Sequence, residues 1–341
     1  MMKFLAILAL AFVGFLPVVA EARIITDAAG RTVSVPDKIN RIVVAGPPAA
    51  VLVYVLAPEK LAGWVHAPDD AAKAYLTASA QALPTVGRLT GKGGTISAQA
   101  VTDAKPDIIL DAGTVDPSYK ALADKVQSET GIPYILVDGS FARTADTLRD
   151  VGALIGVEDR ANKLADYADS ETKDLNDKLA KLPNDPRPRV YYGRGADGLE
   201  TGLSGSINLE ILDAVGTMNV AAAAGKVGLT KVTPQQVVGW NPDIIIADDA
   251  NFAALAKSDP QWAGIKAVKD GKIFVPPSLP FGWFDSPPGV NRLLGVRWME
   301  KLLYPKLFRS DFAGDVKEFY KLFYQVDLTD AQMATLLRGV K

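Results

Sequence analysis

The sequence predicts an α/β protein of two similar lobes with mainly parallel sheets, joined by one long helix. Short β-branched runs alternate with helix-compatible stretches, and the second half of the chain repeats this order. Between the halves, residues 158–182 keep one amphipathic helical pattern. Regular alternation of strands and helices is typical of a largely parallel sheet. We therefore expect one α/β unit on each side of a connecting helix.

Each lobe has its own set of predicted elements. The first lobe, residues 23–157, has predicted strands at 41–45, 61–65, 107–110 and 134–137 and a first helix at 48–56. The second lobe, residues 183–341, has predicted strands at 189–192, 243–247 and 272–275 and a helix at 207–214. β-branched and aromatic residues dominate these strands, as expected for buried sheet positions.

One pair of segments, residues 97–110 and 233–246, aligns without gaps between the two halves. Each contains Pro-Asp-Ile-Ile after a stretch opened by Ser97 or Thr233. Ser and Thr are favoured at the N-cap of a helix, and Pro234 suits the first helical position. Each segment thus predicts a capped helix, a turn and a buried strand. Chance recurrence of this unit in an α/β protein is the alternative to an internal repeat.

The connecting helix is predicted over residues 158–182. Apolar or small side chains recur at Leu164, Ala168, Leu175, Leu179 and Leu182, with charged residues between them. A helix of about 25 residues is about 38 Å long. Prolines follow it at 183, 186 and 188 and end the helical pattern. Such a stiff link permits only small movements of one lobe against the other.

The first 22 residues have the pattern of a secretory signal peptide. Lys3 supplies a positive start, residues 4–20 carry no charge, and Ala20-Glu21-Ala22 is a small-x-small cleavage site. We expect cleavage after Ala22 and release of the mature chain into the periplasm. An uncleaved membrane anchor is the alternative, and it normally needs about 20 apolar residues.

The composition excludes several classes of protein. The 341 residues include 37 Lys and Arg, 39 Asp and Glu, one His and no Cys, with a formal charge of -2. We expect no nucleic-acid partner, because no basic block is present to hold a phosphate backbone. Without cysteine there is no thiol catalysis, Cys-ligated zinc, disulfide or lipid-modified cysteine. With His66 as the single histidine, one chain cannot build a multi-histidine metal site.

The order of signal peptide, lobe, helix and lobe resembles the class III periplasmic substrate-binding proteins of ABC importers. The resemblance covers residues 25–337, and the segments that carry it are 26–36, 40–44, 61–64, 105–109, 209–216, 241–245 and 270–275. It implies two Rossmann-like lobes with a ligand cleft between them, no catalytic residue, no cofactor and no resident metal. It also implies a monomer that delivers a small-molecule metal chelate to an inner-membrane ABC permease.

Residues at the carboxyl ends of the predicted strands form the candidate site, because ligands of open α/β sheets bind there. The candidates are Gly46, Pro47, Trp64, His66, Arg88, Lys92, Gly113, Tyr192, Arg194, Asp248, Phe281, Trp283 and Phe284. The last three lie in the window 276–289, where seven of fourteen residues are Pro or Gly. Large aromatics often form walls of ligand pockets, and Trp283 is the leading candidate. Burial of the three rings beneath the loop is the alternative.

Charged and ligating side chains bear on the kind of ligand. The guanidinium groups of Arg194, Arg88 and Arg292 suit the carboxylates, catecholates or hydroxamates of ferric siderophores and haem. A solvated surface role is the alternative for Arg88 and Arg292. His66 and Tyr192 are candidate haem ligands, with an ordinary polar position at a strand end as the alternative.

Two glutamines occupy positions where the resembled family commonly has glutamate for docking to the permease. Gln99 and Gln235 lie in the helices before the two Pro-Asp units. A neutral amide keeps a hydrogen bond but loses the charge-assisted contribution. Docking through other acids, such as Asp103 and Glu210, and a plain surface role for both glutamines are the alternatives.

The sequence therefore predicts a periplasmic receptor that binds an iron chelate, a ferric siderophore first, and delivers it to an ABC importer. Haem, cobalamin or an oxyanion such as molybdate are alternative ligands, since Gly-rich backbone and Arg suit oxyanions. An enzyme is the alternative from another class. It has little support, because no nucleophile elbow, phosphate loop or metal-ligand cluster is present in the sequence.

Overall fold

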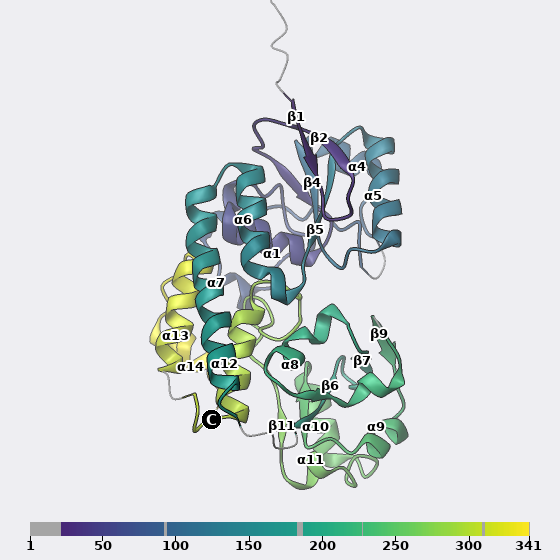
Figure 1. The fold of residues 1–341 in the computed structure, drawn as a ribbon, viewed down its shortest axis with the longest axis vertical. Helices are drawn as coiled ribbons and strands as arrows, with labels where there is room; N and C mark the ends of the chain where they lie inside the picture. Colours follow the sequence, from purple (N-terminus) through teal and green to yellow (C-terminus); the bar gives the residue numbers. More distant parts are fainter. Residues whose placement is uncertain (1–21, 92–93, 183–186, 227, 309–310, 341) are drawn as a thin grey trace, which may run out of the picture.

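The computed structural model describes residues 22–91, 94–182, 187–226, 228–308 and 311–340. The predicted signal peptide, apart from Ala22, lies outside these residues, as does Lys92. The predicted α/β fold class is confirmed, with two lobes of mainly parallel sheet and a column of helices along one side (Figure 1). Within the described ranges, none of the helices has the length and apolar character that crossing a membrane requires.

The first lobe is built on a three-stranded parallel sheet of order β3-β4-β5. Its strands are β3 (Ile42–Val44), β4 (Ile108–Gly113) and β5 (Tyr134–Asp138), and an antiparallel hairpin of β1 (Ala22–Thr26) and β2 (Thr32–Pro36) precedes them. The helices are α1 (Pro47–Leu56), α2 (Asp70–Lys73), α3 (Ala78–Gln81), α4 (Ala98–Asp103), α5 (Pro117–Thr130) and α6 (Thr144–Ile155). The predicted strand at residues 61–65 is wrong: this segment makes single bridges from Leu61 to Ile42 and from Trp64 to Thr85.

The second lobe has a four-stranded parallel sheet of order β11-β10-β6-β8. Its strands are β6 (Arg189–Gly193), β8 (Met218–Asn219), β10 (Ile244–Ala247) and β11 (Ile273–Phe274), beside the antiparallel pair β7 (Glu200–Gly202) and β9 (Leu229–Lys231). The helices of this part are α8 (Glu210–Ala214), α9 (Pro234–Trp240), α10 (Ala250–Ser258) and α11 (Lys266–Lys269).

The two Pro-Asp units have the same local structure, as the ungapped alignment predicts. Ser97 caps α4 and Thr233 caps α9 through side-chain oxygens that accept backbone N–H groups. Lys105 and Asn241, at equivalent positions, both have a positive φ, of 48° and 45°. In each unit the Asp after the proline also accepts a backbone N–H: Asp107 from Arg41, just before β3, and Asp243 from Arg189 of β6. Local capping and turn chemistry thus set this geometry twice.

Helix α7 (Glu158–Leu179) joins the lobes and ends three residues before the predicted end at Leu182. It packs closely on α6, where a Cβ on Gly152 would lie 2.1 Å from the Cβ of Ala161. Beyond the second sheet follow α12 (Arg292–Leu303), α13 (Phe312–Phe319), a π-helical turn (Tyr320–Tyr324) and α14 (Asp330–Leu336). In Figure 1 these helices lie along α7.

The end of the chain packs against the first lobe. The Tyr54 hydroxyl donates to the backbone oxygen of Tyr324, and the Arg160 guanidinium donates to the backbone oxygens of Leu322 and Phe323. One hydrophobic core runs through the first lobe, α7 and the C-terminal helices. The predicted second lobe, residues 183–341, therefore includes helices that lie on the first lobe.

Candidate ligand cleft

A cleft of about 500 Å³ lies between the two lobes. It is lined by residues 47–48, 88, 90–91, 111–114, 119, 194, 200, 207–208, 229 and 285–288. Many of them follow directly on the carboxyl ends of parallel strands: β3 on one side, β4 beside it, and β6 on the other side. This edge of open α/β sheets is where ligands bind. The arrangement of the two sheets thus explains the position of the cleft.

Thr90 and Asp111 define the wall on the first lobe. The backbone N–H groups of Leu89 and Thr90 donate to the carbonyl of Ala45, so the loop is fixed to the end of β3. The Thr90 hydroxyl lies 3.4 Å from Asp111 Oδ1, and the Tyr134 hydroxyl donates to Asp111 Oδ2 at 2.9 Å. Burial raises the pKa of the Asp111 carboxyl to about 6, against the effect of these two hydrogen bonds.

Arg194 defines the wall on the second lobe. Its Nη1 donates to Glu200 at 2.7 Å, and its Nε lies 2.7 Å from Asp285 Oδ2. Asp285 is buried and accepts a hydrogen bond from Asn208 Nδ2, and the Tyr192 hydroxyl lies 3.3 Å from its Oδ2. Burial raises the pKa of the Asp285 carboxyl to about 6, although the Arg194 charge acts in the opposite direction. Two carboxylates therefore hold one guanidinium at the cleft.

Several predicted site residues meet at this cleft. Pro47 and Arg88 line it from the first lobe and Arg194 from the second. Gly46 lies just beneath the wall, where a Cβ would come within 2.6 Å of the Thr90 hydroxyl. Gly113 also lines the cleft.

The predicted aromatic wall is wrong, and the alternative of burial beneath the loop holds. Trp283 and Phe284 have no exposed surface. The Trp283 indole N–H donates to the Tyr320 hydroxyl at 3.2 Å, and Phe284 lies 4.3 Å from the ring of Tyr192. These two rings turn inward because their burial in the core removes large apolar surfaces from water.

Trp64 and Phe281 belong to a second aromatic group in the core of the first lobe. Their ring centroids are 6.0 Å apart, and both rings pack against Tyr54. The Trp64 indole donates to the carbonyl of Ala80 at 2.8 Å, and its side chain is almost fully buried. Neither ring lies in the lining of the cleft. The prediction of Trp64 as a ligand contact is therefore wrong as well.

The remaining candidates lie behind the cleft or outside it. Tyr192 is fully buried, and its hydroxyl donates to Asp248 at 2.9 Å. His66 is exposed and is not part of the cleft lining. Arg292 is buried and bonded on every side, so the surface role considered for it is wrong. Within the part of the chain that the structure describes, no cluster of three or more His, Asp or Glu side chains is arranged to hold a metal ion.

Sequence reasoning missed the polar side chains that fix the cleft. Thr90, Asp111, Asn208, Asp285 and Ser286 all line it. The sequence holds two signals: Asp111 directly follows the apolar run at residues 108–110, and Asp285 lies in the Pro- and Gly-rich window 276–289. A carboxyl at the end of a buried strand is costly unless it is hydrogen-bonded, and so it merits notice.

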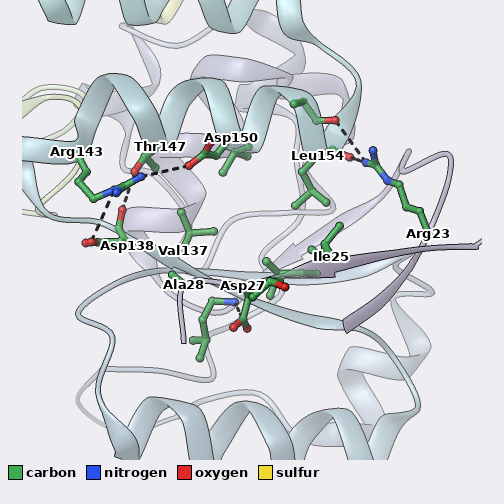
Figure 2. A pocket seen from close by; sticks show the side chains of 15 residues that line it. Arg23, Ile25, Asp27, Ala28, Val137, Asp138, Arg143, Thr147, Asp150 and Leu154 are labelled. Carbon is green, nitrogen blue, oxygen red and sulfur yellow. Dashed lines mark hydrogen bonds and ion pairs between the residues drawn. The ribbon is translucent and has the colours of Figure 1, made fainter. Parts of the chain in front are cut away.

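A second hollow, of about 550 Å³, lies on the first lobe between the β1–β2 hairpin, β5 and α6 (Figure 2). Arg143 points toward Asp138 and Asp150 at one end, at 4.0 and 3.5 Å. At the other end Arg23 donates to the carbonyl oxygens of Ala153 and Leu154, which lie at the last turn of α6. These charges are used within the lobe, and the hollow is away from the strand ends, so the interlobe cleft is the better candidate.

Two α/β lobes, one connecting helix and a cleft at the strand ends define a class III binding protein of an ABC importer. The chain belongs to the periplasmic binding protein family, whose model matches residues 42–279. The proteins of this family that resemble the chain are binding proteins, which deliver small ligands to ABC permeases.

Three named proteins are similar over most of the chain. The molybdate-binding protein MolA of Haemophilus influenzae is 28% identical, covering 89% of this chain and 91% of MolA. Its molybdate-bound structure has a TM-score of 0.75 and covers 90% of this chain and 99% of that one. An ABC transporter solute-binding protein of Sulfurospirillum deleyianum has a TM-score of 0.83 at 28% identity, covering 93% and 99%. A Bacillus subtilis ABC transporter substrate-binding lipoprotein is 26% identical over 63% of this chain and 67% of its own length.

Proposed function

We propose that this protein is a periplasmic receptor that captures a small oxyanion, molybdate first, and delivers it to an inner-membrane ABC permease. The observation that carries the proposal is the polar lining of the cleft. Arg88, Arg194 and the hydroxyl of Thr90 line it together with the backbone of Gly91 and Gly113. Such groups offer hydrogen bonds to oxyanion oxygens. The similarity to the molybdate-binding MolA over most of both chains supports the same ligand class.

Net charge is not what draws the anion in this proposal. The two arginines share the cleft with three carboxyl groups, those of Asp111, Glu200 and Asp285. Affinity must then come from correctly placed hydrogen-bond donors, which are strong where one partner is charged. The carboxyls serve to hold the donors, as Asp285 holds Arg194.

A ferric chelate, the ligand first expected from the sequence, is the second candidate. A cleft of about 500 Å³ offers more room than one tetrahedral oxyanion needs. A B. subtilis Fe(3+)-citrate-binding protein is 25% identical over 52% of this chain. Against haem and cobalamin, the buried positions of Trp64 and Trp283 leave the cleft without the broad aromatic wall that large planar ligands favour.

Calorimetric titration of the mature protein decides between the two ligand classes. Sodium molybdate, tungstate and sulfate are titrated first, and ferric citrate and a ferric siderophore follow. We expect saturable binding of molybdate, and Arg194→Gln should weaken it about 10- to 100-fold, the usual range for a lost charged hydrogen bond. Arg143→Gln, which removes the same charge from the other hollow, is the matched control and should bind normally. Binding of a ferric chelate with no binding of any oxyanion would contradict the proposal.

Export and docking complete the proposed role. Cleavage after Ala22 would release a monomer that begins at Arg23, and N-terminal sequencing of the periplasmic protein tests this. Gln99 on α4 and Gln235 on α9 are both exposed, one on each lobe, as two docking points require. Gln99 donates to Asp103 at 2.8 Å, so an acid lies beside this amide. We propose that these two helix faces meet the permease.

A further inference from the structure

Arg292, the first residue of α12, makes hydrogen bonds to four groups although it is only 2% exposed. Its Nε donates to the carbonyl of Gly289 at 3.1 Å. Its Nη1 donates to the carbonyl of Ile207 at 3.0 Å and to Glu210 Oε2 at 2.9 Å. Its Nη2 donates to the carbonyl of Gly139 at 2.6 Å. A planar guanidinium suits such a set of acceptors, because its donors point in fixed directions.

One of these acceptors lines the cleft, and two others lie next to residues that line it. Ile207 itself lines the cleft, and Gly289 follows Pro288, which also lines it. Gly139 donates its backbone N–H to the carbonyl of Gly113, another lining residue, at 2.9 Å. One buried side chain thus bonds to the segments at Ile207 and Gly289 and, through Gly139, supports the lining residue Gly113.

The ion pair of Arg292 and Glu210 also contacts the first lobe. Glu210 begins α8 in the second lobe, and its Oε2 accepts the backbone N–H of Phe141, in the first lobe, at 2.6 Å. The Arg292 guanidinium lies 5.5 Å from the centre of the Phe141 ring. Opening the lobes at this point would break the hydrogen bond from Arg292 to the Gly139 carbonyl and the one from the Phe141 N–H to Glu210, and each lost bond is costly.

We propose that Arg292 and Glu210 are positioning residues that fix the separation of the lobes and the shape of the cleft in the free protein. Neither side chain needs to touch the ligand for this role. We call the Arg292–Glu210 pair the clasp. The stiff helix α7 limits the rotation of one lobe against the other, and the clasp fixes their relative position in the free protein. The binding consequence rests on the proposed function, whereas the effect on the lobes does not.

Another buried arginine on the same helix provides a matched control. Arg297 forms ion pairs with Glu171 and Asp174 of α7 and with Glu300 of α12. It is also largely buried and multiply bonded, but none of these three partners lines the cleft. Substitution of either arginine by lysine removes a buried guanidinium group with a comparable number of hydrogen bonds and ion pairs. Only the change at Arg292 should alter the cleft.

The experiment measures the lobe separation and the binding of molybdate in the same variants. Because the protein has no cysteine, Gln99→Cys and Gln235→Cys place one spin label on an exposed helix of each lobe. The distance distribution is measured by pulsed electron resonance in the labelled parent, in Arg292→Lys, in Glu210→Gln and in Arg297→Lys. Glu210→Gln keeps the size of the side chain and an acceptor oxygen. It therefore still tests the inference if Arg292→Lys does not fold.

We expect a narrow distribution in the parent and in Arg297→Lys, and a broader one in Arg292→Lys and Glu210→Gln. The Kd for molybdate should rise about 10-fold in the two clasp variants and stay within about 2-fold in Arg297→Lys, even where its melting temperature falls. Narrow, unshifted distributions in both clasp variants would overturn the inference. If the parent binds no molybdate, the proposed ligand is wrong, while broadening in the clasp variants still supports the clasp.

Discussion

Replacing Asp111 by Asn should change how the stability of this protein depends on pH. Asp111 is 4% exposed, and burial raises the pKa of its carboxyl from 3.8 to about 6. The native state therefore keeps the proton at pH values where the unfolded chain has released it. The stability linked to this group is fully present below pH 3.8 and is lost as pH rises through about 6.

The size of the effect follows from the pKa shift. A shift of about 2 units corresponds to about 3 kcal/mol between the two protonation states. Part of this is already lost at pH 4, because the unfolded chain titrates near that pH. Between pH 4 and pH 7.5, the free energy of unfolding of Asp111→Asn should therefore rise relative to the parent by about 2 to 3 kcal/mol.

Urea unfolding of both proteins at pH 4, 5, 6 and 7.5 measures this difference directly. Subtracting one curve from the other removes the contribution of Asp285, whose buried carboxyl titrates in the same range in both proteins. Glu318→Gln, at an exposed carboxyl on α13, is the control and should run parallel to the parent. If the difference between Asp111→Asn and the parent stays constant across the range, the carboxyl is not buried as described.

Three other variants test the core, the cleft wall and the docking surface. Trp283→Ala should lower the free energy of unfolding by about 3 to 5 kcal/mol, as for other fully buried aromatics, while the Kd for molybdate changes little. Gly139→Ala should weaken molybdate binding, because the new Cβ would lie 2.7 Å from the Cα of Gly113 in the cleft wall. Gln99→Arg and Gln235→Arg together should reduce uptake in cells, mainly through slower association with the permease, and leave affinity in solution unchanged.

Each of these substitutions has an outcome that would count against it. If Trp283→Ala lost affinity for molybdate and kept normal stability, Trp283 would be a ligand contact and not a core residue. For the glycine, Gly239→Ala is the control, since no heavy atom lies within 4 Å of its added Cβ; equal behaviour of the two variants would show that the contact with Gly113 does not matter. Normal uptake by the double glutamine variant would place the permease contact on another surface.

The parts of the fold that depend on local chemistry could be predicted from the sequence. The two Pro-Asp units follow from an N-cap residue, a turn and a buried strand, all within fourteen residues, and Ser97 and Thr233 cap their helices as predicted. The cleft residues Pro47, Arg88 and Arg194 were predictable because each follows the end of a strand or lies in a loop beside one. Strand ends meet at one edge of a parallel sheet whatever the details of the packing.

In the window 276–289, the sequence does not determine which way the aromatic side chains point. Its composition indicates a loop with large aromatic rings, and nothing local says whether they face a ligand or the core. Trp283 turns into a core built by distant segments, where Tyr320, 37 residues further on, accepts its indole N–H. The strand predicted at residues 61–65 is wrong for a related reason: the segment is buried like a strand, but it forms β-bridges at only two positions, Leu61 and Trp64. Both outcomes depend on distant segments.

The side chains behind the cleft fit one physical principle, which is that binding is tighter when the site is already ordered. Asp111 lies beside Thr90, Asp285 holds Arg194, and Arg292 ties the surrounding segments together. The burial that raises the pKa of both carboxyls costs folding free energy at neutral pH, so these groups lower the stability of the folded protein there. These two carboxyls do fix hydrogen-bond donors of the cleft in place, since a buried charge tolerates few alternative geometries. A cleft ordered in this way need not close far around its ligand, which agrees with a link made of one stiff helix.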